Sequence, residues 1–251
     1  MQTVSRELNL SLKTEQMHYQ ADGLSMIGHL AWGDDFDSSR PGILVFPEAF
    51  GLSEHAKHRA ERLATEFGYV ALACDLHGDG KVVESLDEVR ELIAPIRTSA
   101  TVARARVEGP LKALAERPEV DSAQIAAIGF CLGGTMAYEL ALTGANIKAA
   151  IGFHSGLEVT SPQDGSQIKG KVLALIGADD PGITPENRRA FEDMLRNAGV
   201  DWQMHLFGGV VHSFTNPEAD ARGMPEYLRY DANADRRSWT YMAELLDEVF
   251  E

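Results

Sequence analysis

The sequence lacks the features that define several classes of protein. Two cysteines in 251 residues cannot build the disulfide framework of a small secreted protein. No apolar run approaches the roughly 20 residues of a membrane-spanning helix. Residues 1–20 also lack a basic stretch followed by an apolar run, so we expect no signal peptide. These absences predict a cytoplasmic protein with no membrane partner.

Positive charge is scarce. The 23 Lys and Arg residues are outnumbered by 38 Asp and Glu residues, which leaves a net charge of −15. A field of this sign repels the phosphates of nucleic acids and of anionic membrane surfaces, so we expect no nucleic-acid partner. The 44% share of hydrophobic residues is ordinary for a folded globular chain, and a homo-oligomer is compatible with it.

What the chain does contain is a regular alternation of strand-length apolar runs and stretches of helical period. This order is typical of the α/β class, with a mostly parallel central sheet and helices on both faces. Residues 16–32 differ, because two alternating runs flank Asp22-Gly23, a dipeptide suited to a tight turn. They predict an N-terminal antiparallel hairpin at one sheet edge. No repeat or linker interrupts the order, so we expect residues 1–251 to form a single domain.

Beyond the hairpin, the apolar pattern predicts six strands and the helices between them. The expected strands are 43–46, 69–76, 124–130, 147–153, 171–177 and 201–207. The expected helices are 54–67, a helical region 83–117 with its main helix at 98–116, 132–143, 186–198 and 234–250. Gly68 should end the first helix. Pro95 should break the first part of the 83–117 region, and Pro110 should lie near a kink or boundary.

The most specific motif is the segment 129–134, Gly-Phe-Cys-Leu-Gly-Gly, between a predicted strand and a predicted helix. A residue with glycines two positions before and after it, in this context, can form a nucleophile elbow. Cys131 would then lie at a helix N-terminus, which favours the thiolate. The backbone N–H of Leu132 would point toward an oxyanion formed there. A buried structural cysteine is the alternative interpretation.

An acid and a base follow in the chain. Asp179 and Asp180 come directly after the strand 171–177, and His212 follows the last predicted strand. The order nucleophile, acid, base is that of the α/β-hydrolase architecture. A neutral imidazole can take the thiol proton, and a carboxylate on its other nitrogen orients the ring. Taken singly, a loop histidine and an aspartate before a proline are ordinary turn residues.

Longer segments around these residues resemble the dienelactone hydrolase family of the α/β-hydrolase superfamily. The resemblance is carried by residues 43–55, 75–80, 121–134, 176–180, 212–214 and 230–239, with GFCLGG its most specific element. It implies the α/β-hydrolase fold with Cys131 as nucleophile, Asp180 as acid and His212 as base. Asp180 is preferred to Asp179 because the family motif has an aspartate three residues after a glycine, here Gly177.

The resemblance also implies roles for the loop after the strand 43–46. Glu48 should lie beside the resting thiol, and the backbone N–H of Ala49 should join that of Leu132 in an oxyanion hole. A carboxylate beside Cys131 opposes its ionisation. Glu48 is therefore expected to gate the thiol until the substrate rearranges the pair, the alternative being an ordinary solvated carboxylate.

The substrate pocket should form where the C-terminal ends of the parallel strands meet. Residues just past these ends include His77 and His154, which we expect in its wall. Phe50, Ser213 and Phe214 are expected there as well.

Metal and cofactor sites are not expected. His55 and His58, three residues apart on a predicted helix, offer only a surface pair where zinc needs three or four ligands. Cys74, in an apolar strand run, is expected to be an inert buried thiol.

Two positions depart from the family pattern. Family members that cleave dienelactone resemble one another in holding its carboxylate with two arginines, where this chain has residues 77–81, His-Gly-Asp-Gly-Lys, and Asn216. Lys81, Arg222 and Arg229 are candidate replacements, but the net charge of −15 does not attract an anionic lactone.

The function predicted from these patterns is hydrolysis of small activated esters or lactones through a thiol acyl-enzyme, with no cofactor. A thioesterase or acyl transferase on the same triad is one alternative. A non-catalytic binding protein on this fold is the other, because fold alone does not imply activity.

Overall fold

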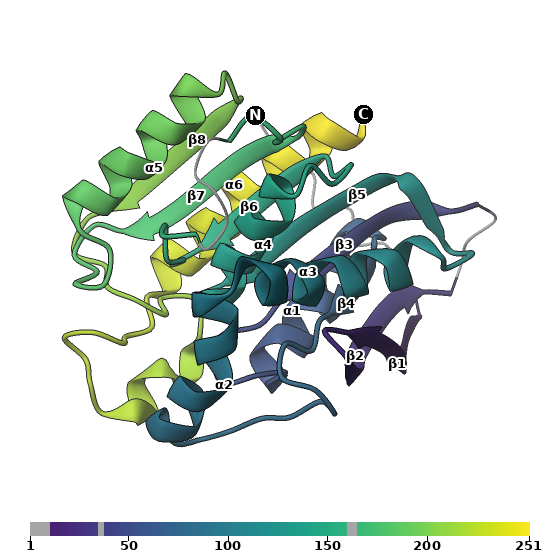
Figure 1. The fold of residues 1–251 in the computed structure, drawn as a ribbon, viewed down its shortest axis with the longest axis horizontal. Helices are drawn as coiled ribbons and strands as arrows, with labels where there is room; N and C mark the ends of the chain where they lie inside the picture. Colours follow the sequence, from purple (N-terminus) through teal and green to yellow (C-terminus); the bar gives the residue numbers. More distant parts are fainter. Residues whose placement is uncertain (1–10, 35–37, 160–164) are drawn as a thin grey trace.

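The computed structural model describes residues 11–34, 38–159 and 165–251 (Figure 1). Residues 1–10 lie outside these ranges, and they are the first half of the segment in which no signal peptide is expected. No helix in the described ranges has both the length and the apolar character needed to cross a membrane.

A single mixed sheet forms the centre of the described structure. Its eight strands lie in the order β1-β2-β4-β3-β5-β6-β7-β8. They are β1 (Leu12–Ala21), β2 (Leu24–Gly33), β3 (Arg40–Phe46), β4 (Val70–Ala73), β5 (Val120–Phe130), β6 (Ala149–Phe153), β7 (Lys171–Gly177) and β8 (Trp202–Phe207). The pairs β1–β2 and β2–β4 are antiparallel, and every other neighbouring pair is parallel. The prediction of a hairpin followed by six strands is confirmed.

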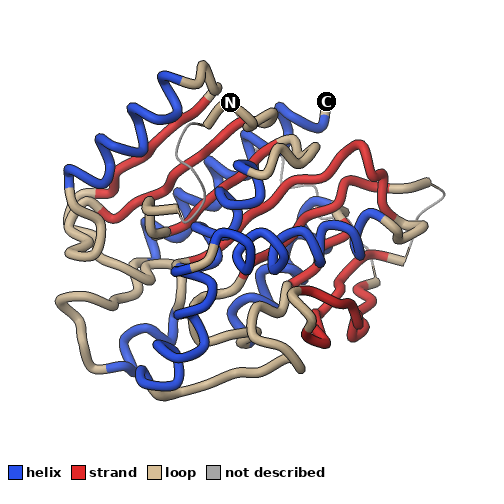
Figure 2. Tube along the Cα trace, in the orientation of Figure 1, coloured by secondary structure: helices blue, strands red, loops and turns tan. Residues whose placement is uncertain are grey.

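Helices cover both faces of this sheet (Figure 2). They are α1 (Glu54–Phe67), α2 (Leu86–Thr98), α3 (Ala100–Ala115), α4 (Leu132–Leu142), α5 (Pro185–Asn197), the 3-10 helix η1 (Pro217–Arg222) and α6 (Ala232–Phe250). Buried side chains of α1 and α6 form one hydrophobic cluster with the sheet, and those of α3, α4 and α5 form another on the opposite face. The predicted α/β-hydrolase architecture is therefore observed.

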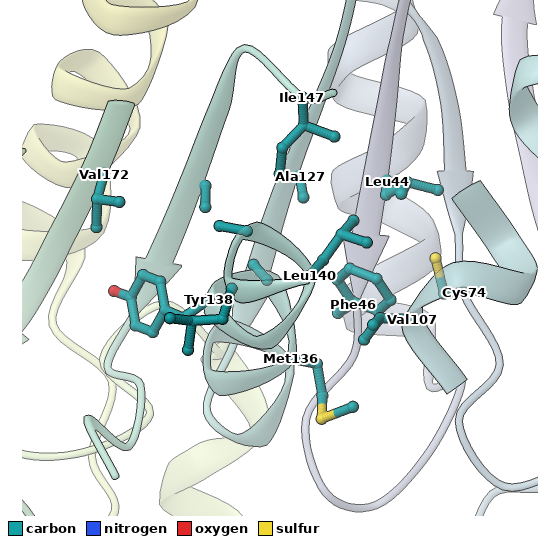
Figure 3. Close-up of a cluster of buried hydrophobic side chains, with 14 of the residues drawn as sticks. Leu44, Phe46, Cys74, Val107, Ala127, Met136, Tyr138, Leu140, Ile147 and Val172 are labelled. Carbon is teal, nitrogen blue, oxygen red and sulfur yellow. The ribbon is translucent and has the colours of Figure 1, made fainter. Parts of the chain in front are cut away.

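Strand alternation explains how the sheet contributes to both clusters. Leu44 and Phe46 of β3 belong to the cluster with α3 and α4, whereas Val45 belongs to the cluster with α1 and α6. Figure 3 shows Leu44 and Phe46 near Val107 of α3 and near Cys74. Cys74 is fully buried, and burial raises the pKa of its thiol well above the ordinary value. The prediction of an inert core cysteine is confirmed in its burial.

The N-terminal hairpin forms as its turn residues predict. Asp22 and Gly23 both take positive φ angles, 51° and 71°, the combination that a two-residue turn between right-twisted strands requires. β1 lies at the sheet edge.

The predicted end of one strand is wrong. The second predicted strand, 69–76, ends at Ala73 in the structure. The buried Asp75 accepts hydrogen bonds from the backbone N–H groups of Ile27, His77, Gly78 and Gly80, which turns the chain out of the sheet. The Asp75 carboxylate thus accepts hydrogen bonds from backbone N–H groups of the loop that have no partner in a neighbouring strand.

The expected break at Pro95 is not observed, and Pro110 does not mark a helix boundary. α2 continues past Pro95 to Thr98, and α3 contains Pro110 in its interior. An internal proline removes one helical hydrogen bond, a cost that packing can outweigh. Gly109 lies where α3 crosses β1, since a Cβ atom there would be 2.6 Å from the Cβ of Ala21.

Candidate active site

Cys131 lies at a sharp turn between β5 and α4. Its backbone has φ 55° and ψ −120°, a conformation that side-chain-bearing residues rarely adopt. Its N–H donates to the carbonyl of Phe153 at 3.0 Å, and its own carbonyl accepts from Gly134 at 3.1 Å. These bonds hold the strained turn that the nucleophile-elbow motif predicts.

The flanking glycines are required by close backbone contacts. A Cβ atom on Gly129 would lie 2.0 Å from the carbonyl oxygen of Gly133. One on Gly133 would lie 2.1 Å from that of Phe46. The spacing of glycines around Cys131 is thus explained by the turn, and Cys131 remains partly exposed at its apex.

His212 and Asp180 meet at this end of the sheet. The Nδ1 of His212 lies 2.6 Å from Oδ2 of Asp180, and the other carboxylate oxygen accepts from the N–H of Gly182 at 2.8 Å. Both side chains are buried. Asp179, the other aspartate considered, is exposed. The structure therefore pairs His212 with Asp180.

The charge state of His212 depends on its neighbours. Burial opposes protonation of the ring, but the interactions of His212 with Cys131 and with the Asp180 carboxylate outweigh it and raise the pKa of His212 well above the ordinary value. A histidine that lies between a cysteine and a carboxylate is suited to take the proton of the thiol.

Glu48 borders the same cavity as Cys131 but bonds elsewhere. Its Oε1 accepts a hydrogen bond from Oγ of Ser213 at 3.0 Å, and its Oε2 accepts one from Nδ2 of Asn216 at 2.6 Å. Only 5% of its surface is exposed. Glu48 and Cys131 both line the cavity, and the hydrogen bonds of Glu48 go to the loop after His212.

The amides expected to form an oxyanion hole also border the cavity. Ala49 and Leu132 both line it, and Leu132 is the first residue of α4, where backbone N–H groups have no helical acceptor. The carbonyl of Ala49 accepts a hydrogen bond from Nε2 of His77 at 2.9 Å. Burial lowers the pKa of His77, so its ring stays neutral and donates from Nε2. His77 thus anchors the peptide next to the expected oxyanion donor.

The cavity has a volume of about 520 Å³ and a mostly apolar wall. Beyond the residues already described, this wall includes Val89, Ile93 and Ile96 of α2, Leu157, Ile183, Met224, Tyr227 and Leu228. Figure 1 shows α2 and the 3-10 segment η1 at the same end of the molecule. The space suits an apolar acyl or aryl group.

Of the five residues expected in the pocket, only Phe50 and Ser213 line it. His77, His154 and Phe214 are buried and do not border the cavity, which corrects the expectation for them. His154 and Phe214 pack against each other behind His212, their ring centroids 5.1 Å apart. A position just past a strand end brings a residue near the site, but packing decides whether it faces the cavity.

The cationic residues of the pocket differ from those considered as carboxylate binders. Lys81, Arg222 and Arg229 do not line the cavity. Arg222 instead lies over the ring of Phe50, 3.4 Å from its centroid. Arg90 and Arg97 of α2 do border the cavity, and neither is among the residues expected there from the sequence. The apolar residues of α2 recur with a helical period, and this pattern in the sequence indicates that one face of the helix is buried against the rest of the protein.

The described residues include no group of three or more His, Cys, Asp or Glu side chains placed to hold a metal ion.

A thiol at a strand-to-helix elbow, beside an acid–histidine pair on a mostly parallel sheet, defines the α/β-hydrolase class. Within this class the chain belongs to the dienelactone hydrolase family, whose model matches residues 30–250. It is accordingly a hydrolase of the carboxylic ester and lactone type.

Relatives of known structure cover nearly the whole chain. A dienelactone hydrolase-like promiscuous phosphotriesterase from metagenomic libraries is 42% identical, with a TM-score of 0.90 over 96% of this chain and 100% of its own. The structure titled m3DLH is also 42% identical, with a TM-score of 0.92 over 96% of this chain and 99% of its own. A curated relative from Yersinia pestis, "Putative carboxymethylenebutenolidase", is 27% identical over 93% of this chain and 90% of its own length.

Proposed function

We propose that this protein hydrolyses activated esters with apolar groups through a covalent thioester on Cys131, with His212 as base and Asp180 as its orienting acid. The observation that supports it most is the placement of His212, which is hydrogen-bonded to Asp180 and electrostatically coupled to Cys131 at the cavity wall. We further propose that the whole chain is one domain and that it works in the cytoplasm.

The reaction takes place in two steps. The Cys131 thiolate bonds to the ester carbonyl carbon, the N–H groups of Ala49 and Leu132 stabilise the oxyanion, and the leaving oxygen departs with a proton from His212. Water then attacks the thioester and gives a proton to His212, and the thiolate is released with the carboxylic acid. No cofactor enters either step.

The cavity indicates the type of ester. A thiolate is a good leaving group itself, so acylation requires an ester whose alcohol leaves at least as readily, such as a phenolate or enolate. The mostly apolar wall and the volume of about 520 Å³ favour esters with bulky apolar groups. This selects aryl and enol esters as first substrates to test.

The test uses 4-nitrophenyl butyrate with Cys131→Ala and, as a matched control, Cys74→Ala. We expect Cys131→Ala to lose at least about a thousandfold in kcat/KM, while Cys74→Ala loses stability but keeps the activity of its folded fraction. Mass spectrometry of quenched wild-type enzyme should show a butyryl adduct on the peptide that contains Cys131. Full activity of Cys131→Ala would contradict the proposal, and a panel of thioesters would show whether these are preferred.

A second candidate activity is hydrolysis of uncharged phosphotriesters, which the printed title of a 42% identical neighbour describes for that protein. The uncharged oxyanion donors and the apolar cavity favour it here. The thiolate would displace an aryloxide from phosphorus, and water would then release the phosphoryl group from sulfur. Turnover of diethyl 4-nitrophenyl phosphate, lost in Cys131→Ala, is the measurement.

A further inference from the structure

The hydrogen bond of His212 indicates where each part of an ester lies in the cavity. Nδ1 of His212 is bonded to Asp180, so Nε2 is the nitrogen that gives a proton to the leaving oxygen. The leaving group must therefore lie beside His212. The acyl group is attached to the same carbonyl carbon as the leaving oxygen, and it extends from Cys131 in a different direction.

The ring of Tyr227 forms the cavity wall beside His212. It stacks on the imidazole, with ring centroids 5.5 Å apart and an interplanar angle of 26°. The N–H of His212 donates to the carbonyl of Tyr227 at 3.0 Å, which fixes the two residues relative to each other. His154 also contacts the His212 ring, but it is fully buried and does not border the cavity. A leaving group on His212 therefore meets Tyr227.

The segment that carries Tyr227 adds further apolar surface. Met224 and Leu228 line the cavity as well, and the carbonyl of Met224 accepts from the N–H groups of Tyr227 at 2.9 Å and of Leu228 at 2.7 Å. The side chain of Tyr227 is 38% exposed, so part of its ring is open to contact. Aromatic rings in contact are more stable than their buried area alone predicts. This part of the wall therefore suits an aromatic leaving group.

Away from His212, the cavity follows the helix α4. One face of this helix lines it, through Leu132, Thr135, Met136 and Glu139, which are spaced by three and four residues. From Leu132 to Glu139 an α-helix rises about 10 Å. The cavity therefore extends about this far along α4 from Cys131. We call this part of the cavity the α4 channel.

The wall of the α4 channel is apolar until the channel reaches the surface. Met136 of α4, Ile96 of α2 and Leu157 of the loop after β6 belong to one buried hydrophobic cluster, and all three line the cavity. Arg97 and Glu158, which also border the cavity, are exposed. An extended chain advances about 1.2 Å per bond, so about eight carbons fill a channel of this length.

Gly156 lies about one helical turn along the channel. Its carbonyl accepts a hydrogen bond from Oγ1 of Thr135 at 2.8 Å, and both residues border the cavity. A Cβ atom on Gly156 would have one described heavy atom within 4 Å, Oγ1 of Thr135 at 3.1 Å. A larger side chain at position 156 therefore has room to extend, and it would take up space in the channel.

We propose that the cavity binds the two parts of an ester on opposite sides of Cys131, with an acyl chain of up to about eight carbons in the α4 channel and an aromatic leaving group against Tyr227. The preferred substrates are then aryl esters of medium-chain carboxylic acids. This inference rests on the proposed function, because the reaction at Cys131 decides which part of the ester lies on which side. Gly156 and Tyr227 determine the specificity.

The first experiment measures kcat/KM for 4-nitrophenyl esters from acetate to decanoate. In the wild type it should rise by up to about fourfold per added methylene as far as octanoate, and no further to decanoate. Gly156→Leu should lower the ratio of the octanoate value to the acetate value at least about tenfold. Gly208→Leu is the matched control, because a Cβ atom there meets nothing within 4 Å and Gly208 does not line the cavity. Its ratio should be that of the wild type.

The second experiment compares phenyl butyrate with hexafluoroisopropyl butyrate. Their leaving alcohols have similar acidity, but only phenol has an aromatic ring. Tyr227→Leu should lower the ratio of the phenyl value of kcat/KM to the fluorinated value about fivefold, while Tyr227→Phe keeps the ratio of the wild type. A purely structural role of Tyr227 would lower both values equally and leave the ratio unchanged. Circular dichroism and urea unfolding verify that each variant is folded.

Three results would overturn the proposal. One is a wild-type kcat/KM that stays constant or falls from acetate to octanoate. Another is an unchanged ratio of octanoate to acetate in folded Gly156→Leu. The third is an unchanged ratio of phenyl to fluorinated ester in Tyr227→Leu. Each of these results is obtained with an active enzyme. They are therefore distinct from failure of the proposed function, which would show as full activity of Cys131→Ala or as an inactive wild type.

Discussion

The ring of His154 packs edge-on against the ring of His212, with centroids 5.2 Å apart and an interplanar angle of 64°. Their environments drive them to opposite charge states. Complete burial and repulsion from His212 lower the pKa of His154 well below its ordinary value, whereas the pKa of His212 is raised by Cys131 and Asp180. Because the ring of His154 is neutral, it does not repel the positive charge of a protonated His212.

This environment predicts an acid-dependent loss of stability. Unfolded His154 takes up a proton as the pH falls below about 6.5, and the folded ring does not. The unfolded state then binds more protons than the folded state. The free energy of unfolding therefore decreases as the pH decreases, by up to about 1.4 kcal/mol per pH unit from this residue. Urea unfolding at about pH 7.5 and 5.5 should show a smaller drop for His154→Gln than for wild type. His18→Gln, on the exposed face of β1, should leave the drop unchanged.

The pairing of His212 with Asp180 predicts which aspartate matters for catalysis. Asp180→Asn keeps the shape of the side chain but removes the charge that orients and stabilises the imidazolium, so kcat should fall about 10³- to 10⁴-fold. Asp179→Asn changes an exposed neighbour and should retain most of the activity. Steady-state kinetics on 4-nitrophenyl butyrate distinguish the two. Equal losses would show that the observed hydrogen bond does not define the acid.

His77 predicts an effect on the oxyanion site without contact to the cavity. Removing its hydrogen bond to the carbonyl of Ala49 loosens the peptide beside the proposed oxyanion donor. We expect His77→Ala to lower kcat about tenfold with little change in KM, since the bond acts on the transition state. His58→Ala, an exposed histidine of α1, is the control. An effect confined to KM would contradict this role.

The close backbone contacts at the elbow predict that replacing Gly133 destabilises the protein far more than replacing Gly208, which has free space around it. Gly133→Ala places a methyl group 2.1 Å from the carbonyl oxygen of Phe46, so backbone must move at the centre of the sheet. The free energy of unfolding should fall by about 3 kcal/mol. Gly208→Ala meets no atom within 4 Å and should change it by less than about 0.5 kcal/mol. Urea titrations of both variants provide the comparison.

Much of the fold is predictable because local signals agree with it. The helix α1 begins and ends where its apolar period and Gly68 predict, and the Asp22-Gly23 turn joins the hairpin as expected. The errors lie where a distant contact overrides the local pattern. Asp75 ends β4 by binding amides of the following loop and of β2.

The candidate site also has features that the sequence predicts and features that depend on the tertiary structure. The motif around Cys131, the chain order of Cys131, Asp180 and His212, and the family resemblance are properties of the linear sequence. Which aspartate meets His212, and which residues face the cavity, depend on side-chain directions that no local pattern specifies. His154 and Phe214 therefore pack behind the site, while Arg90 and Arg97 border it.

The sequence by itself determined the class of sheet, the elbow, the family and the separation of the two cysteines, because each is encoded by residues close together or by their order. Only the tertiary structure decided where the charge of Glu48 lies. Its donors Ser213 and Asn216 are 165 and 168 residues away in the chain, and only the convergence of β3 with the loop after β8 brings them to one carboxylate.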